Sequence, residues 1–155
     1  MAAPGKLGSA AKVKGAEHER LHDFTNSRLQ EGLAPVRVGI DLIEIERIRG
    51  AIERYPRFRE RCFTPAERAY CDSRPNPAES YAGRFAGKEA VGKALGCGVH
   101  FTWREIEIAG RPKPGVRLSG RTQAWAERVH AGEIDLSMTH SRELAAAICL
   151  VGDRA

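Results

Sequence analysis

The first clear pattern in the chain is an alternation of apolar and polar residues from Val36 to Leu42, a segment with the sequence "VRVGIDL". A period of two is typical of a half-buried β-strand, so we expect one side to face the core. That apolar side carries Val36, Val38, Ile40 and Leu42. Asp41 should then end the strand and point away from it. The next segment has the isoleucine spacing of an amphipathic helix, at Ile45, Ile48 and Ile52.

One local pattern predicts the start of two further helices. In this pattern a capping residue is followed by a proline at the first helical position and a glutamate at the third. The signal occurs as "TPAE" at 64–67 and as "NPAE" at 76–79. The second helix should run from about Pro77 to Leu95, with Gly96 as its C-cap. Glycines weaken a helix interior, so we expect something to pack or bind close to this helix's backbone, at Gly83, Gly87 and Gly92.

The rest of the chain alternates short strand patterns with one helix. Residues 105–108 and 116–120 read as a hairpin joined by a Gly/Pro-rich loop, 122–132 as a short helix, and 134–139 as a strand. The apolar segment 143–151 favours a central strand, with a buried helix as the alternative. We therefore predict an α+β fold in which helices pack against a small, mostly antiparallel sheet.

Length and composition indicate one folded domain with an extension. The chain has 155 residues; residues 1–34 are rich in Gly, Ala, Ser and mixed charge, and we assign them to an N-terminal extension before a domain at 35–155. The longest apolar run, 145–151, is too short to span a membrane, and no signal-peptide pattern opens the chain. Four scattered cysteines are most simply free thiols, and we expect a soluble cytoplasmic protein.

The charge of the chain favours an acidic or phosphorylated partner. The formal net charge is +5 and the pI is about 9.3. Six arginines fall within residues 47–61, interleaved with two glutamates. Such a run is commonly a solvated helix face, but its excess of arginine also suits docking of an acidic partner. Both interpretations stay open at this point.

Two carboxylates stand out as candidate chemistry. Asp41 should end a strand and Glu89 should lie in the middle of the long helix. Mg²⁺ is usually held by one or two carboxylates together with substrate phosphates, and Lys93 shares a helix face with Glu89. The plainer alternatives are a solvated Glu89–Lys93 pair and a helix-capping role for Asp41. His140, at an expected turn, either is structural or holds a phosphate.

Three segments together resemble the holo-acyl-carrier-protein synthases, a group of small bacterial 4′-phosphopantetheinyl transferases. The segments are "VGIDLIEIERI" at 38–48, "GRFAGKEAVGKALGCG" at 83–98 and "SMTHSRELAAA" at 137–147, in the order and spacing of that family. The resemblance implies Mg²⁺-dependent transfer of phosphopantetheine from coenzyme A to a serine of an apo acyl carrier protein, releasing adenosine 3′,5′-bisphosphate. This reaction would supply carriers for fatty acid, polyketide or peptide synthesis. The resemblance further implies a homotrimer that binds the coenzyme between neighbouring subunits.

The resemblance also assigns residues to these roles. It implies metal binding by Asp41 and Glu89, with Glu89 and Lys93 as the catalytic residues. The positions that it assigns to coenzyme A are Lys88, Lys93, Gly96, Gly98 and His140. The resemblance also implies that the acidic carrier protein docks on four arginines: Arg47, Arg54, Arg57 and Arg61. Two alternatives remain: a non-catalytic paralogue that only binds the carrier protein, and a basic nucleic-acid-binding module. Nucleic acid is not expected as a partner, because few aromatic residues lie within the basic run.

Overall fold

The computed structural model describes residues 36–97, 101–110 and 113–154, and the expected extension at 1–34 lies outside these residues. The helices are α1 (Ile45–Arg54), α2 (Phe58–Cys62), α3 (Pro65–Asp72), α4 (Pro77–Ala94) and α5 (Gly120–Arg128), with a 3₁₀ turn η3 (Trp103–Glu105). The strands are β1 (Val36–Glu44), β2 (Ile106–Ala109), β3 (Gly115–Leu118), β4 (Ala131–His140) and β5 (Leu144–Asp153). Every predicted helix and strand of the described part is present, and α2 and η3 are additional.

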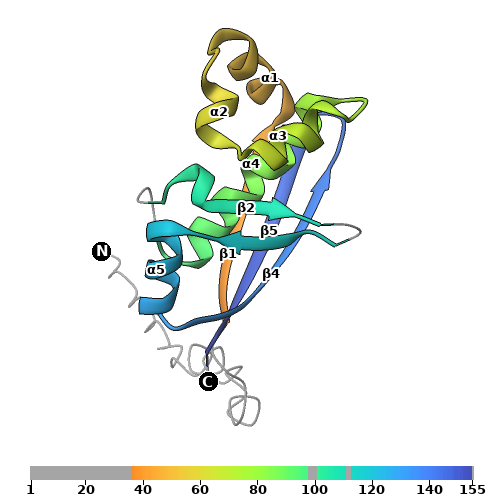
Figure 1. Ribbon diagram of the computed structural model, residues 1–155. Coiled ribbons are helices and arrows are strands. Elements are labelled where there is room, and N and C mark those ends of the chain that lie inside the picture. Colours follow the sequence, from red (N-terminus) through yellow and green to blue (C-terminus); the bar gives the residue numbers. More distant parts are fainter. Residues whose placement is uncertain (1–35, 98–100, 111–112, 155) are drawn as a thin grey trace, which may run out of the picture. The chain divides into compact units, whose positions relative to one another are not determined.

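The strands form two antiparallel sheets (Figure 1). In the larger sheet β5 lies between β1 and β4, and Asp41 of β1 is paired with Ala147 of β5. The second sheet is the hairpin of β2 and β3. This arrangement confirms the predicted α+β class and the central strand at the end of the chain, and it excludes the buried-helix alternative for that segment.

Helix α4 packs against one face of the larger sheet, while α1, α2 and α3 gather at one end of it (Figure 1). The contact between α4 and β1 is close because Gly39 has no side chain. A Cβ atom at Gly39 would lie 2.0 Å from the carbonyl oxygen of Ala90 and 2.6 Å from the backbone nitrogen of Ala94. Buried small residues of β5, such as Ala145 and Ala147, permit the same close approach. This close contact places Asp41, two residues after Gly39 on β1, next to α4.

The prediction that the apolar side of β1 faces the core is wrong. The inward residues are instead Gly39, Asp41 and Ile43. The other face of the sheet, which we call the open sheet face, exposes six large apolar side chains in the single chain: Val36, Val38, Ile40, Leu42, Ile148 and Leu150. The alternation was recognised correctly, but the side of β1 that meets α4 is the one with Gly39, because a side chain at that position would clash with the backbone of the helix.

The expected helix signals are confirmed in most details. Thr64 and Glu67 form a complete capping box at the start of α3. Asn76 precedes Pro77 as predicted, although it makes no side-chain cap to the backbone and donates to Glu79 instead. Helix α4 ends at Ala94, and Gly96 follows with a φ of 67°, the left-handed conformation that favours glycine after a helix.

The interior glycines of α4 have different surroundings. A Cβ atom at Gly87 would lie 2.5 Å from the side chain of Ile108, and one at Gly92 would lie 2.7 Å from the ring of Phe101. At Gly83 no atom of residues 36–97, 101–110 or 113–154 lies within 4 Å of that position. Side-chain packing therefore explains Gly87 and Gly92, and Gly83 borders open space.

All four cysteines are buried free thiols. Among the helices of the described residues, none combines the length and the apolar character needed to cross a bilayer.

Candidate functional site

Asp41 and Lys93 form one side of the candidate site. Asp41 projects from β1 toward α4, and its side chain is 15% exposed. The Nζ atom of Lys93 donates to Asp41 Oδ1 at 2.8 Å and to the carbonyl oxygen of Ile40 at 2.9 Å. Lys93 is therefore paired with the acid across the helix–strand contact, rather than with Glu89 on its own helix.

Glu89 completes the cluster. Its carboxylate is half-buried and accepts no hydrogen bond from the described part of the chain. Burial raises the pKa of the Glu89 carboxyl above its ordinary value, the negative charge of Asp41 raises this pKa further, and Lys93 partly opposes both effects. The structure thus brings together the three residues that the sequence selected: Asp41, Glu89 and Lys93.

This cluster has the character of a site for a hard divalent cation. Two neighbouring carboxylates with one ammonium group leave a local excess of negative charge, which a cation would relieve. No group of three His, Cys, Asp or Glu side chains suited to a metal occurs among the described residues. Two carboxylates are nevertheless the usual protein share for Mg²⁺, which keeps several waters and takes its other ligands from phosphate oxygens. The residues present therefore fit the ion.

Lys88, which the sequence analysis assigned to coenzyme A, lies elsewhere. Its side chain has no exposed surface, and its Nζ atom lies 2.7 Å from Glu67 Oε2. Burial lowers the pKa of Lys88, although the charge of Glu67 opposes this shift. The side chain cannot reach a bound coenzyme without leaving these partners, so we remove Lys88 from the proposed coenzyme site. A rotation of about 100° per residue puts adjacent helical positions on different faces, which explains the separation from Glu89.

The two glycines assigned to coenzyme A lie at the end of α4. Gly96 is exposed, and no atom of the described residues lies within 4 Å of the position that a Cβ would take. Its backbone is therefore accessible to a ligand. Gly98 lies outside the described residues.

His140 lies at the end of β4 beside a second hollow, of about 200 Å³. Its Nε2 atom is 3.3 Å from Glu79 Oε1. Arg84 also lines the hollow and is 7% exposed. Its guanidinium lies 3.9 Å from the centre of the Tyr70 ring, and its Nε has no hydrogen-bond partner within the part of the chain that the structure describes. Arg74 adds another cation. The hollow therefore suits an anionic group, and sequence reasoning missed both arginines.

A single chain does not bring His140 together with the carboxylate cluster. Glu79, the partner of His140, precedes Glu89 by ten positions on α4, which is about 15 Å along the helix axis. The two positions also face different sides of the helix.

The four arginines predicted to dock a carrier protein differ from their neighbours. Two other arginines of this segment are paired with acids, Arg49 with Glu46 and Arg59 with Asp72. Within the described ranges the predicted four have no acidic partner, and we call them the arginine surface: Arg47, Arg54, Arg57 and Arg61. All four are exposed. Their charge is thus available to an acidic partner.

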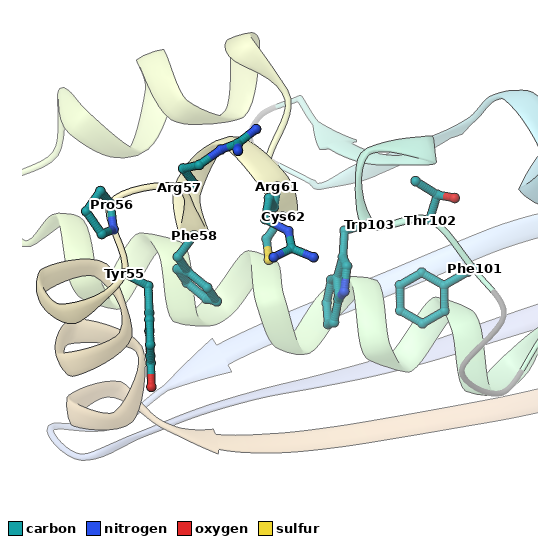
Figure 2. A pocket seen from close by; sticks show the side chains of 9 residues that line it. All are labelled: Tyr55, Pro56, Arg57, Phe58, Arg61, Cys62, Phe101, Thr102 and Trp103. Atoms are coloured by element: carbon teal, nitrogen blue, oxygen red, sulfur yellow. The ribbon is translucent and has the colours of Figure 1, made fainter.

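Sequence reasoning also missed a pocket of about 700 Å³ next to the arginine surface. Figure 2 shows Tyr55 and Phe58 on one side of this pocket, and Trp103 and Phe101 on the other. Arg57 and Arg61 are among its lining residues. We call it the aromatic pocket. The aromatic residues of 101–103 were the available signal, but their distance in sequence from 55–58 concealed the contact.

Known proteins share this fold. Residues 37–149 match the 4′-phosphopantetheinyl transferase superfamily, and the chain therefore belongs to it. The holo-[acyl-carrier-protein] synthase of Moorella thermoacetica is 48% identical over 118 residues, which are 73% of this chain and 91% of that protein. This chain is accordingly a member of the holo-[acyl-carrier-protein] synthase family, which confirms the resemblance drawn from the three motifs.

Solved structures agree with this assignment. A Chronobacterium ammoniagenes ACPS–CoA complex has a TM-score of 0.69 and 28% identity, and the match covers 78% of this chain and 99% of that one. The Helicobacter pylori holo-[acyl-carrier-protein] synthase in complex with coenzyme A has a TM-score of 0.66 and 30% identity, covering 74% of this chain and 99% of that one.

Proposed function

We propose that the chain transfers 4′-phosphopantetheine from coenzyme A to a serine of an apo acyl carrier protein, releasing adenosine 3′,5′-bisphosphate. The observation that carries the proposal is the cluster of Asp41, Glu89 and Lys93 at the contact of β1 and α4. Family membership supports the same reaction.

The cluster offers what phosphoryl transfer needs, which is mainly positioning and neutralisation of charge. Asp41 and Glu89 would hold Mg²⁺, which when bound supplies positive charge to the pyrophosphate oxygens. Lys93, which is half exposed and already directed at this cluster, would place its ammonium group against the leaving phosphate. The exposed backbone at Gly96 leaves room for the coenzyme beside the helix end.

Binding of coenzyme A between subunits of a homotrimer would unite the two parts that a single chain keeps separate. The hollow with Arg84 and His140 would hold an anionic part of the coenzyme that reacts at a neighbouring subunit's carboxylate cluster. The open sheet face supports this assembly, because a contiguous apolar surface of this kind usually marks an interface. The four free thiols favour the cytoplasm as the location.

The arginine surface would dock the carrier protein, which is expected to be acidic. Opposite charges raise association rates and fix orientation, and this effect weakens with salt. Arg54→Glu should therefore raise the KM for the carrier protein and leave the affinity for coenzyme A unchanged. The matched control is Arg128→Glu on α5, which lies at the other end of the sheet from α1 (Figure 1). Equal losses for both substrates would refute docking at this surface.

The central experiment incubates the chain with coenzyme A, Mg²⁺ and apo carrier proteins, and measures the mass of each carrier. We expect a gain of one phosphopantetheine group, and its loss in Glu89→Gln. The control Glu127→Gln changes an exposed carboxylate of α5 and should behave as the unmodified chain does. Absence of a mass gain with several carriers would refute the transfer. Tight binding of carrier and coenzyme without a mass gain would instead identify a non-catalytic paralogue.

A further inference from the structure

A fully buried ion pair joins α3 to α4, and the reaction described above gives it no role. Lys88 directs all of its donors inward: its Nζ lies 2.7 Å from Glu67 Oε2, 2.8 Å from the carbonyl oxygen of Trp103 and 2.6 Å from that of Ile106. An ammonium group has three donors, so its capacity is used completely. Trp103 is the first residue of the turn η3, and Ile106 is the first residue of β2.

Both carboxylate oxygens of Glu67 also have hydrogen-bond partners inside the protein. Its Oε2 accepts from the backbone nitrogen of Thr64 at 2.8 Å, and its Oε1 accepts from that of Ile108 at 2.9 Å. The hydroxyl of Thr64 in turn donates to Glu107 at 2.8 Å. The pair therefore ties three segments together: the start of α3, the middle of α4, and the stretch from Trp103 to Ile108.

Trp103, the first residue of that stretch, and Phe101 before it lie along the side of α4 that carries Glu89. Positions 85, 89 and 92 share one helical face. The ring of Trp103 stacks on Phe85 with centroids 4.3 Å apart, and Phe101 packs against Gly92. Figure 2 shows Trp103 and Phe101 following one another along α4, as one wall of the aromatic pocket. Along α4, Glu89 thus lies between the contact of Trp103, whose carbonyl Lys88 holds, and the contact of Phe101, two residues before Trp103.

A buried ion pair is a poor device for stability alone. Removing two charges from water is costly, and apolar residues of similar volume often give equal or greater stability. What apolar residues cannot supply is three hydrogen bonds of fixed direction to two segments. The geometry of Lys88 and Glu67 is therefore suited to orientation.

We propose that Lys88 and Glu67 are positioning residues for the transfer reaction: they fix the Trp103–Ile108 stretch on α4, and so fix the surroundings of Glu89. This inference rests on the proposed transfer function. Neither residue touches a substrate. Their effect reaches Glu89 through the helix backbone and through the stack of Trp103 on Phe85.

The test is the double variant Lys88→Met/Glu67→Gln, which removes both charges and leaves neither one unpaired. We expect kcat to fall about 100-fold, the loss typical of a misplacement of about 1 Å, with an unchanged KM for the carrier protein. The matched control is Val151→Ala, which cuts a fully buried side chain of β5, a strand outside the three segments that the pair joins, and so destabilises the core elsewhere. All rates are measured well below each variant's melting temperature.

A second readout separates positioning from mere stability. The chain has two tryptophans, Trp103 and Trp125, so 5-fluorotryptophan gives two ¹⁹F resonances. In the double variant the Trp103 resonance should shift while that of Trp125 stays, and in Val151→Ala both should stay. Full kcat in the double variant would overturn the proposal, as would an unshifted Trp103 resonance or an equal loss of kcat in Val151→Ala.

If the double variant does not fold, the variant Glu67→Asp tests the positioning role instead. It keeps the charge but shortens the side chain, so that it cannot reach Lys88, Thr64 and Ile108 together. A lower kcat with a shifted Trp103 resonance supports positioning, and native values of both overturn it. Failure of the unmodified chain to modify any carrier would overturn the transfer function itself, which is a different result from full activity in these variants.

Discussion

Gly39→Ala is the sharpest test of how the fold builds the carboxylate cluster. The added Cβ would lie 2.0 Å from the carbonyl oxygen of Ala90 and 2.6 Å from the nitrogen of Ala94, and both are backbone atoms that cannot rotate away. Strand β1 must therefore move off α4, by roughly 1 Å or more at close-packed distances. Because Asp41 is two residues further along β1, the shift also separates it from Glu89 and Lys93.

We expect this variant to lose about 1–3 kcal/mol of stability, as overpacked cores do, and about 100-fold in kcat. Thermal denaturation measures the first effect, and the mass gain of the carrier protein measures the second, well below the melting temperature. Gly115→Ala is the matched control, because among the described residues its Cβ would meet the oxygen of Ala109 alone, at an ordinary 3.6 Å. A stable Gly39→Ala chain with full kcat would show that the close contact of β1 and α4 does not position Asp41.

Further predictions concern the cap, the metal, the open sheet face and the thiols. Thr64→Ala removes the capping box of α3 and should cost about 1–2 kcal/mol, measured by thermal denaturation; an unchanged melting temperature would contradict this. EDTA should abolish phosphopantetheine transfer and added Mg²⁺ should restore it, whereas transfer in EDTA would refute the metal site. Ile40→Lys should convert trimers to monomers in sedimentation experiments, and intact trimers would show that this face is not the interface. Burial raises the pKa of Cys71 and of Cys149 to about 12, so thiol reagents at pH 8 should modify these residues only after unfolding, and rapid reaction of the native chain would disprove that.

The sequence predicted the order of elements well, because strand alternation and helix signals are local. The capping box of Thr64 and Glu67 and the left-handed Gly96 are examples. The direction in which a strand faces is not a local property. Val38 and Ile40 alternate as core residues do, yet in one chain they lie on the open sheet face, because the backbone of α4 leaves no space for a side chain at position 39 and so meets the side of β1 that carries Gly39.

The candidate site shows the same limit. The helix period correctly set Lys93 on the face of Glu89 and Lys88 on another. It could not reveal that Lys93 would pair with Asp41, or that Lys88 would meet Glu67 in the core, because both partners lie on other elements. The aromatic pocket likewise joins Phe58 to Trp103 across 45 positions of the chain.

Strand β1 carries the open sheet face on one side and Asp41 on the other. If the subunits associate through this face, dilution would do more than lower the number of enzyme molecules. The specific activity would itself decline below the dissociation constant of the trimer, since each lone subunit would lack a neighbour to complete its coenzyme site. A cell that makes little of this chain would then have disproportionately little carrier-modifying capacity.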